Sequence, residues 1–475
     1  MQFNSFYFLL FFTAIILFYY LIPNKNYQRT FLIATSLFFV FQANYLSLLV
    51  ICLIAILNYF FGIGIETKKN NFAGKFIFYL AILINISNLF FFKYYDFFLE
   101  NLSGFLGLFN FKNPPQVLKL ILPIGISFYT FQILGYLIDI WQENLKPEKD
   151  ILVFLNYVFF FPKLLAGPIE RAQNFFPQAK ESKYILLSNF SAGGKLLIWG
   201  FFQKLVIADR IAIYVDSVYH NFDQHSGITL LVCSVLYVFQ VYADFSGYTD
   251  IARGLAKILG YDLMINFRRP LLAFSITDFW RRWHISLSSW VNDYIYMPLS
   301  LKFRAIGKAG VFIALFVSFI IVGIWHGAKW TFVVFGVLQG IFLVVELMTL
   351  RKKKKLATKI PAWILNGAGL LMTFILITVS LIFFRSPSLK IALSVFAKIN
   401  INGKLFLGTA SFFLYSLIGI LILMMHDICL EIFKKDIFKF KSDYFILRGF
   451  PYAMLVIIIL MIGVFDGGQF IYFNF

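Results

Sequence analysis

The sequence predicts an all-α protein that crosses a membrane many times, and three observations predict this class. Of its 475 residues, 60% are hydrophobic and 14% are charged, which is more apolar surface than a soluble core of this size can bury. The apolar residues lie in long runs. No polar stretch between them exceeds about thirty residues, too short for a folded extramembrane domain. We therefore expect one membrane-embedded domain over residues 1–475, with a short aromatic segment at 470–475.

The apolar runs are candidate crossings, and because some are expected to be re-entrant we predict roughly eleven true spans. The first has neither a basic segment before it nor a small-residue cleavage site, so it is expected to be retained. The run at 151–165 is short and precedes a Pro- and Gly-containing kink, which favours a re-entrant or buried segment. The runs lie at 3–22, 30–42, 45–65, 76–99, 117–141, 151–165, 185–215, 228–251, 309–325, 331–350, 363–384, 408–430 and 450–466.

The net charge of +19 indicates orientation in a membrane. In a soluble protein this charge would suggest nucleic acid, but here the cations lie in short loops between apolar runs, so no nucleic-acid partner is expected. By the positive-inside rule, the clusters at 25–29, 68–75, 351–359 and 434–448 face the cytoplasm. Counting crossings from these clusters predicts that the N-terminus and the segment 470–475 lie on the outer side.

Metal and disulfide chemistry are not expected. Cys52, Cys233 and Cys429 are far apart in the sequence, and no C-x-x-C pair occurs.

Residues 266–298 carry too many ionisable groups for a lipid-facing span. Ser275 and Asp278 form a capping box, which predicts a helix start. Aromatic and apolar residues then recur on one face, which predicts a single amphipathic helix, re-entrant or interfacial. An interfacial anchor explains this pattern, and so does a site in which arginines hold a phosphate-bearing donor while His284 shapes an acyl site. The face consists of Phe279, Trp283, Leu287, Trp290 and Tyr294.

A second exception is the segment 323–330, which places His326 between glycines among apolar runs. An intramembrane histidine is a candidate functional group, although a histidine that only hydrogen-bonds to a neighbouring helix fits as well. The glycines allow close approach of a backbone or ligand. Carboxylates also lie near apolar runs, and for Asp244 and Asp250 we favour a structural role over a proton path.

Five segments of the chain carry a family signature in this order: 122–132, 166–169, 244–248, 278–288 and 325–328. Together they resemble the membrane-bound O-acyltransferases, and specifically their bacterial branch of alginate and PatA-type peptidoglycan O-acetylation proteins. The resemblance implies a ring of transmembrane helices around a thin centre, where a donor tunnel from the cytoplasm nearly meets a funnel from outside. It also implies the bacterial inner membrane, with the N-terminus and the segment 470–475 in the periplasm.

The resemblance implies roles for single residues. His326 is implied as the catalytic histidine, His284 as a second functional histidine and Tyr472 as an acyl carrier, although a tyrosine in an interfacial belt is the simpler explanation of Tyr472 by composition. Asn292 stands where the family commonly has arginine. The implied contacts to the donor come from Arg268, Arg269, Arg281, Arg282, Trp283, Asn292 and Trp325.

The function implied is transfer of acetyl from a cytoplasmic thioester, acetyl-CoA being the expected donor with no permanently bound cofactor, through Tyr472 to a periplasmic partner. That partner is expected to be an SGNH-type esterase-like protein, because this chain has no Gly-Asp-Ser nucleophile motif. The end acceptor is cell-envelope polysaccharide, with peptidoglycan favoured over alginate or another exopolysaccharide. A small-anion transporter is the alternative from another class, and acylation of lipid is a third possibility.

Overall fold

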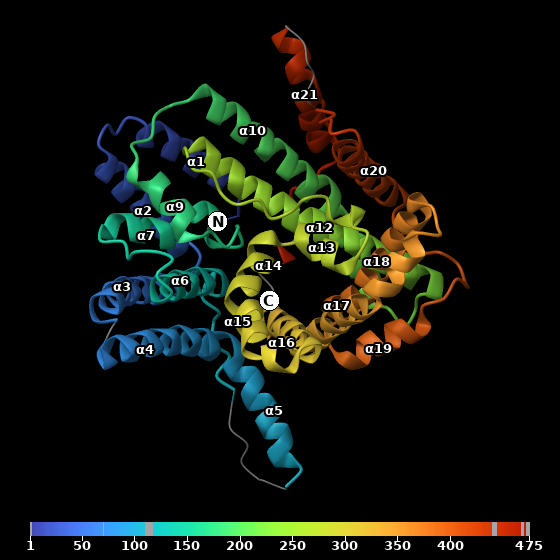
Figure 1. The fold of residues 1–475 in the computed structure, drawn as a ribbon. Helices are drawn as coiled ribbons and strands as arrows, with labels where there is room; N and C mark the ends of the chain where they lie inside the picture. Colours follow the sequence, from blue (N-terminus) through green and yellow to red (C-terminus); the bar gives the residue numbers. More distant parts are fainter. Residues whose placement is uncertain (1, 70, 110–116, 439–443, 467–469, 472–475) are drawn as a thin grey trace. The chain divides into compact units, whose positions relative to one another are not determined.

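The computed structural model describes residues 2–69, 71–109, 117–438, 444–466 and 470–471. The chain forms two compact units, the first of Met1–Gly193 with Ala252–Met264 and the second of Gly194–Ile251 with Ile265–Phe475. Every regular element in the described ranges is a helix (Figure 1), which confirms the all-α class.

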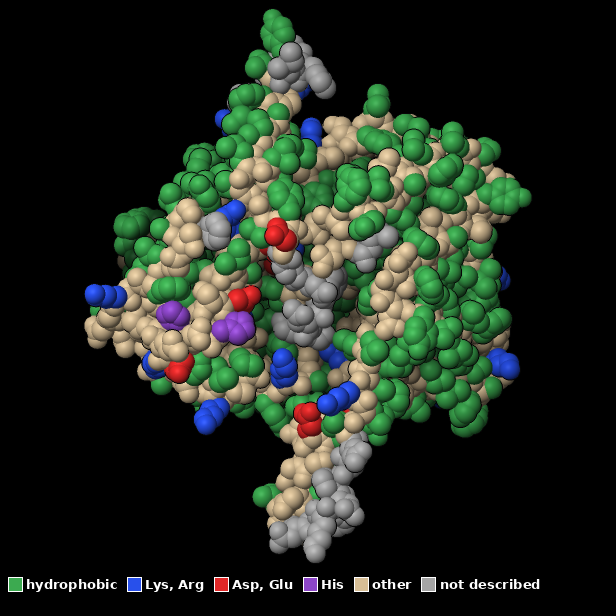
Figure 2. All heavy atoms as spheres, turned by 180° about the vertical axis from the view of Figure 1, so that it is seen from behind, with side chains coloured by type: hydrophobic (Ala, Val, Ile, Leu, Met, Phe, Trp, Pro, Cys, Tyr) green, Lys and Arg blue, Asp and Glu red, His purple; other side chains and the backbone are tan. Residues whose placement is uncertain are grey.

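Seven helices of the described ranges are long and apolar enough to cross a membrane, which confirms a polytopic membrane protein. Hydrophobic side chains also cover broad areas of the face shown in Figure 2, as lipid contact requires. The total of about eleven crossings stays a prediction. The seven helices are Tyr45–Lys68, Phe72–Gly107, Gly227–Ile258, Lys308–His326, Trp330–Ala357, Ala362–Arg385 and Phe413–Phe433.

In the first unit, α3 and α4 are joined through two buried asparagines. The side-chain amide of Asn58 donates to Oδ1 of Asn85 at 3.2 Å, and that of Asn85 donates back at 2.7 Å. Such pairs satisfy polar groups between apolar helices. The helices of this unit are α1 (Phe6–Tyr19), α2 (Lys25–Phe41), α3 (Tyr45–Lys68), α4 (Phe72–Leu89), η1 (Phe90–Tyr94), α5 (Tyr95–Gly107), α6 (Ile126–Trp141), α7 (Ile151–Phe159), α8 (Phe161–Leu164) and α9 (Ala172–Lys180).

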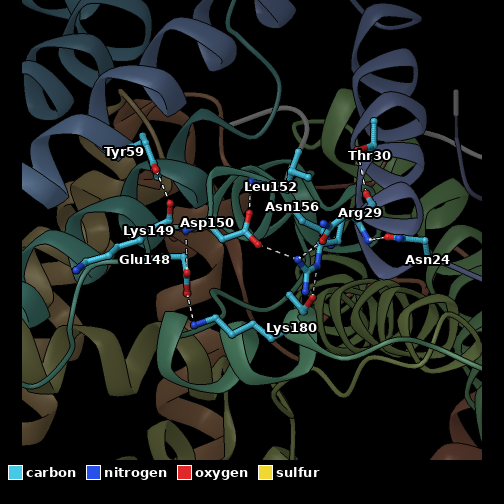
Figure 3. Close-up of polar contacts among 12 residues, drawn as sticks. Asn24, Arg29, Thr30, Tyr59, Glu148, Lys149, Asp150, Leu152, Asn156 and Lys180 are labelled. Atoms are coloured by element: carbon cyan, nitrogen blue, oxygen red, sulfur yellow. Dashed lines mark hydrogen bonds and ion pairs between the residues drawn. The ribbon is translucent and has the colours of Figure 1, made fainter.

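Polar contacts fix the loop before α7 in this unit (Figure 3). The buried Arg29 of α2 donates to Asp150 Oδ2 at 2.8 Å and to the carbonyl of Ala179 at 2.6 Å. Asp150 also caps α7 by accepting from the backbone of Leu152 at 2.9 Å. Lys180 pairs with Glu148 at 2.6 Å. One arginine therefore joins α2, the start of α7 and the end of α9.

Two apolar runs of the first unit form shorter helices than their length suggests. Of the run 117–141, only Ile126–Trp141 is helical, because Gly125 takes a left-handed φ of 71° just after Pro123. The run 151–165 divides into α7 and α8 and is largely buried, in agreement with a buried segment.

In the second unit, α16 and α17 form a tight helical hairpin. A Cβ atom on Gly336 would lie 2.4 Å from the carbonyl oxygen of Phe319 and 3.1 Å from Cα of Gly323, so only glycines allow these backbones to approach so closely. The divisions between the units at residues 193/194 and 251/252 fall within α10 (Leu187–Phe201) and α12 (Gly227–Ile258).

The remaining elements of the second unit are η2 (Phe202–Ala208), α11 (Asp209–His220), η3 (Pro270–Leu272), α13 (Ile276–Arg282), α14 (Ile285–Val291), η4 (Asn292–Tyr296), α15 (Met297–Lys302), η5 (Arg304–Ile306), α16 (Lys308–His326), α17 (Trp330–Ala357), α18 (Ala362–Arg385), α19 (Leu389–Lys398), α20 (Ala410–Ile432) and α21 (Phe445–Ile462).

The end of α10 and the π-helix η2 that follows it pack against α12 at another pair of glycines. A Cβ atom on Gly200 would lie 2.7 Å from the carbonyl oxygen of Gly247, and one on Gly247 would lie 3.1 Å from the backbone nitrogen of Lys204. This contact brings Lys204 beside α12. Helices α20 and α21 both pack against the same turn.

Candidate active site

His326 is the last residue of α16, at the turn of the α16–α17 hairpin. The next residue, Gly327, is extended, and a Cβ atom there would lie 2.5 Å from the ring of Phe332. The glycine is thus needed for the turn to close against α17, which confirms the expected close approach. His326 is 3% exposed, and its ring lies 5.1 Å from that of Phe384.

His284 lies at a break in what the sequence predicts as one helix, so that prediction is wrong at this point. The Ser275 cap is confirmed, because its side chain accepts from the backbone of Asp278 at 3.1 Å. The helix then ends, and His284 takes a left-handed φ of 43°. The segment before η3 replaces the lost helical partners: Asn266 accepts from the backbone of Ile285 through its carbonyl at 2.9 Å and from the backbone of Ser286 through its side chain at 3.1 Å.

A chain of aromatic rings joins the two histidines. The ring of Trp325 lies 5.8 Å from that of His284 and 5.2 Å from that of His326, measured between centroids. On the other side, Phe245 of α12 lies edge-on to His284 at 4.6 Å. The structure therefore brings the two predicted histidines together around the predicted Trp325.

Burial shifts the pKa of His284. Desolvation lowers the pKa of this imidazole well below its usual value, and the nearby His326 lowers it further. A neutral imidazole has one nitrogen that donates and one that accepts a hydrogen bond.

The four predicted arginines have different environments. Arg269 and Arg282 both pair with Glu431 of α20, at 2.6 and 3.0 Å, and Arg282 also pairs with Asp278 at 2.8 Å. Arg268 and Arg281 are exposed. Two of the four guanidinium groups are thus held by carboxylates of the protein, which the sequence prediction missed.

Arg281 and Asn292 line a cavity of about 530 Å³ between α13 and α17, a volume typical of ligand pockets. Its walls are mostly apolar, with hydroxyl groups from Ser288 and Ser289. A separate void of about 20 Å³ adjoins His326 and is lined by Trp283 and Phe384, among others. Trp283 therefore lies on the histidine side.

Trp280 lines both the cavity and the void, so its indole forms part of the wall between them. The indole nitrogen donates to Gln339 at 3.0 Å, and Gln339 donates to Ser380 at 2.8 Å. These bonds tie α13 to α17 and α18. This position of Trp280 is not predicted from the sequence. The only feature of the sequence that indicates the contact is a polar glutamine within an apolar run.

The aromatic segment also reaches this region. Tyr472 lies outside the described residues, but Phe470 and Ile471 are described. The ring of Phe470 stacks on Tyr248 at 4.4 Å and lies 5.6 Å from Phe245, the ring that contacts His284. The backbone of Ile471 donates to Asp244 Oδ2 at 2.9 Å.

Comparison with known proteins agrees with this geometry. Residues 142–386 match the sequence model of the membrane-bound O-acyltransferase family. The chain is 35% identical to the peptidoglycan O-acetyltransferase of Helicobacter pylori, over 80% of this chain and 75% of that protein. It is 32% identical to the probable alginate O-acetylase AlgI of Pseudomonas syringae pv. tomato, over 82% and 74%.

A teichoic acid D-alanyltransferase from Bacillus subtilis is more distant, 26% identical over 64% of this chain and 76% of that one. The similarity therefore spans most of the chain, including both histidines and the helices that carry them. The chain belongs to the membrane-bound O-acyltransferase family and is an acyltransferase.

Proposed function

We propose that this protein takes acetyl from acetyl-CoA on the cytoplasmic side of the inner membrane and transfers it to the phenol of Tyr472. A periplasmic partner then moves the acetyl group to a hydroxyl of cell-envelope polysaccharide. The observation that carries the proposal is the position of Phe470: it packs on Phe245, which packs in turn on His284. The residues just before Tyr472 thus lie on the aromatic cluster that contains both histidines.

His326 acts as the general base in this scheme. A free phenol has a pKa of about 10 and is mostly neutral at pH 7, so it needs a base to attack. His326 removes the phenol proton as the oxygen attacks the thioester carbonyl. The carbon–sulfur bond then breaks, and the CoA thiolate leaves and receives the proton. The products are an acetyl ester on Tyr472 and free CoA.

The cavity beside Arg281 suits the donor. Its mostly apolar wall fits the pantetheine arm, and the exposed guanidinium of Arg281 fits a phosphate. Arg269 and Arg282 already pair with Glu431 and are less available for that role. Trp280 then separates the arm from His326, so donor binding must displace or bypass its indole.

Peptidoglycan is the proposed end acceptor, because the relative from Helicobacter pylori bears that activity in its name. The names of the Pseudomonas relatives make alginate or another exopolysaccharide the second candidate. A partner of the SGNH type is proposed for the last transfer.

Labelling of the purified full chain tests this function. Incubation with radiolabelled acetyl-CoA is expected to place label on the peptide that contains Tyr472, as located by mass spectrometry. Tyr472→Phe should remove the label, and His326→Ala should reduce its rate by about a hundredfold or more. His220→Ala is the matched control, because that histidine is exposed and remote from the cluster in sequence.

Label on Tyr472→Phe at the wild-type level would contradict the carrier role. Label in lipid would indicate an acyltransferase that acts on lipid. Anion flux into vesicles without any label would favour the transporter.

A further inference from the structure

A buried charge cluster lies in the second unit, apart from the two histidines. The ammonium of Lys204 in η2 pairs with Asp209 and with Asp244, each at 2.7 Å. The side chains are between 2% and 10% exposed. Lys204 donates to only one oxygen of Asp244, so the second oxygen of this buried carboxylate remains for another donor. A further donor is expected at one of the carboxylates.

That donor is a backbone amide. Ile471 donates its N–H to the second oxygen of Asp244 at 2.9 Å, while Lys204 holds the first oxygen. Asp244 therefore connects the charge cluster to the aromatic segment. The contact is made by the backbone of Ile471, so it does not depend on the side chain at position 471.

Other contacts hold the chain that leads to this point. The backbone of Val464 donates to the carbonyl of Leu205 at 3.0 Å, and the side chain of Arg210 donates to the carbonyl of Ile462. Phe470 is 3% exposed, and its ring stacks on Tyr248. Residues 462–464 are thus attached to η2 and α11, and residues 470–471 are attached to α12.

We propose that Asp244, held in place by Lys204, is a positioning residue that anchors the aromatic segment through the amide of Ile471. The next residue is Tyr472, and consecutive Cα atoms are about 3.8 Å apart, so the anchor limits how far the phenol can move. A charged acceptor makes a stronger hydrogen bond than a neutral one, which suits this purpose. The importance of the anchor for acetyl transfer rests on the proposed function.

The test removes the donor without touching the buried cluster. Ile471→Pro deletes the N–H, whereas the matched control Ile471→Ala retains it and loses only side-chain bulk. Hydrogen exchange of the amides that both variants carry in the peptide 470–475, measured by mass spectrometry on the full chain in nanodiscs, is expected to be at least about tenfold faster in Ile471→Pro than in Ile471→Ala. Labelling of Tyr472 at saturating acetyl-CoA should fall by a similar factor, with KM for the donor unchanged.

Asp244→Asn tests the same hydrogen bond by changing its acceptor. It retains the shape of the side chain but removes its charge, and it should accelerate exchange in the same peptide. Its thermal unfolding is measured in parallel, because loss of charge beside Lys204 also affects folding.

Equal exchange in Ile471→Pro and Ile471→Ala would overturn the anchor. A failure of the carrier role gives a different pattern of results. If the wild-type protein shows no label on Tyr472 but Ile471→Pro still exchanges faster, the anchor stands and the carrier role fails. If Ile471→Pro exchanges faster but labels Tyr472 at the rate of Ile471→Ala, the anchor does not position the phenol and the proposal is wrong.

Discussion

Neighbouring arginines in this protein have different environments. Arg281 and Arg282 are adjacent in sequence, and successive helical residues point in different directions. Arg282 pairs with Asp278 and Glu431, whereas Arg281 is exposed at the cavity of about 530 Å³. The sequence predicts all four arginines as one group. Pairing with Glu431 distinguishes two of these arginines from the exposed ones. Glu431 lies 149 positions from Arg282, and no local sequence pattern indicates such a distant partner.

Arg281→Ala is expected to raise the KM for acetyl-CoA by about tenfold, because the proposed contact with a phosphate of the donor is lost, with little change in Tm. Arg282→Ala should instead lower the free energy of unfolding by roughly 1–3 kcal/mol, because Glu431 and Asp278 lose a charged partner. Both expectations are tested by measuring the kinetics of acetyl transfer and the thermal unfolding of both variants. An unchanged KM in Arg281→Ala would contradict its contact with the donor.

At the scale of the element, the break between α13 and α14 gives His284 its position. The cap at Ser275 is visible in the sequence because capping is local. The break is not visible, because it depends on Asn266, which lies before η3 and bonds to the backbone of Ile285 and Ser286. Histidine takes a left-handed φ more often than most residues, but this preference alone does not predict where a helix breaks. The helix start was predictable and the helix end was not, for this reason.

The α16–α17 hairpin depends on the contact between Gly323 and Gly336. Gly336→Ala is expected to destabilise the protein by roughly 1–3 kcal/mol, because the new methyl group meets the backbone at Phe319, which cannot rotate away. Acetyl transfer should fall as well, since His326 ends α16. Gly367→Ala in α18 is the matched control, because a Cβ atom there has nothing within 4 Å. Equal Tm values for the two variants would contradict this packing.

At the scale of the whole molecule, composition and run length were enough to predict an all-α polytopic protein. They were not enough to predict the helix lengths. Helix α6 begins only at Ile126, because Gly125 interrupts the run before it. Within the second unit, the contact of the aromatic segment with α12 joins residues 227 positions apart, Ile471 and Asp244. The periodicity of hydrophobic residues in the sequence does not indicate a contact between residues so far apart.

Orientation in the membrane follows from the basic loops and is testable on the full chain. In a background without Cys52, Cys233 and Cys429, Ile401→Cys is expected to react with an impermeant maleimide on intact cells. Lys353→Cys should react only after permeabilisation, because the cluster 351–359 is predicted to face the cytoplasm. Both positions are exposed. The opposite labelling pattern would reverse the predicted topology.

The hairpin that carries His326 has a consequence for the order of folding. Gly323 and Gly336 are only 13 positions apart, so closing this loop costs little chain entropy. Contacts of such short range form quickly. The turn that holds His326 can therefore form during biosynthesis as soon as its two helices have been inserted, whereas the contact between Ile471 and Asp244 must wait for more than a hundred further residues. The proposed base is thus in place before the segment that leads to the proposed carrier.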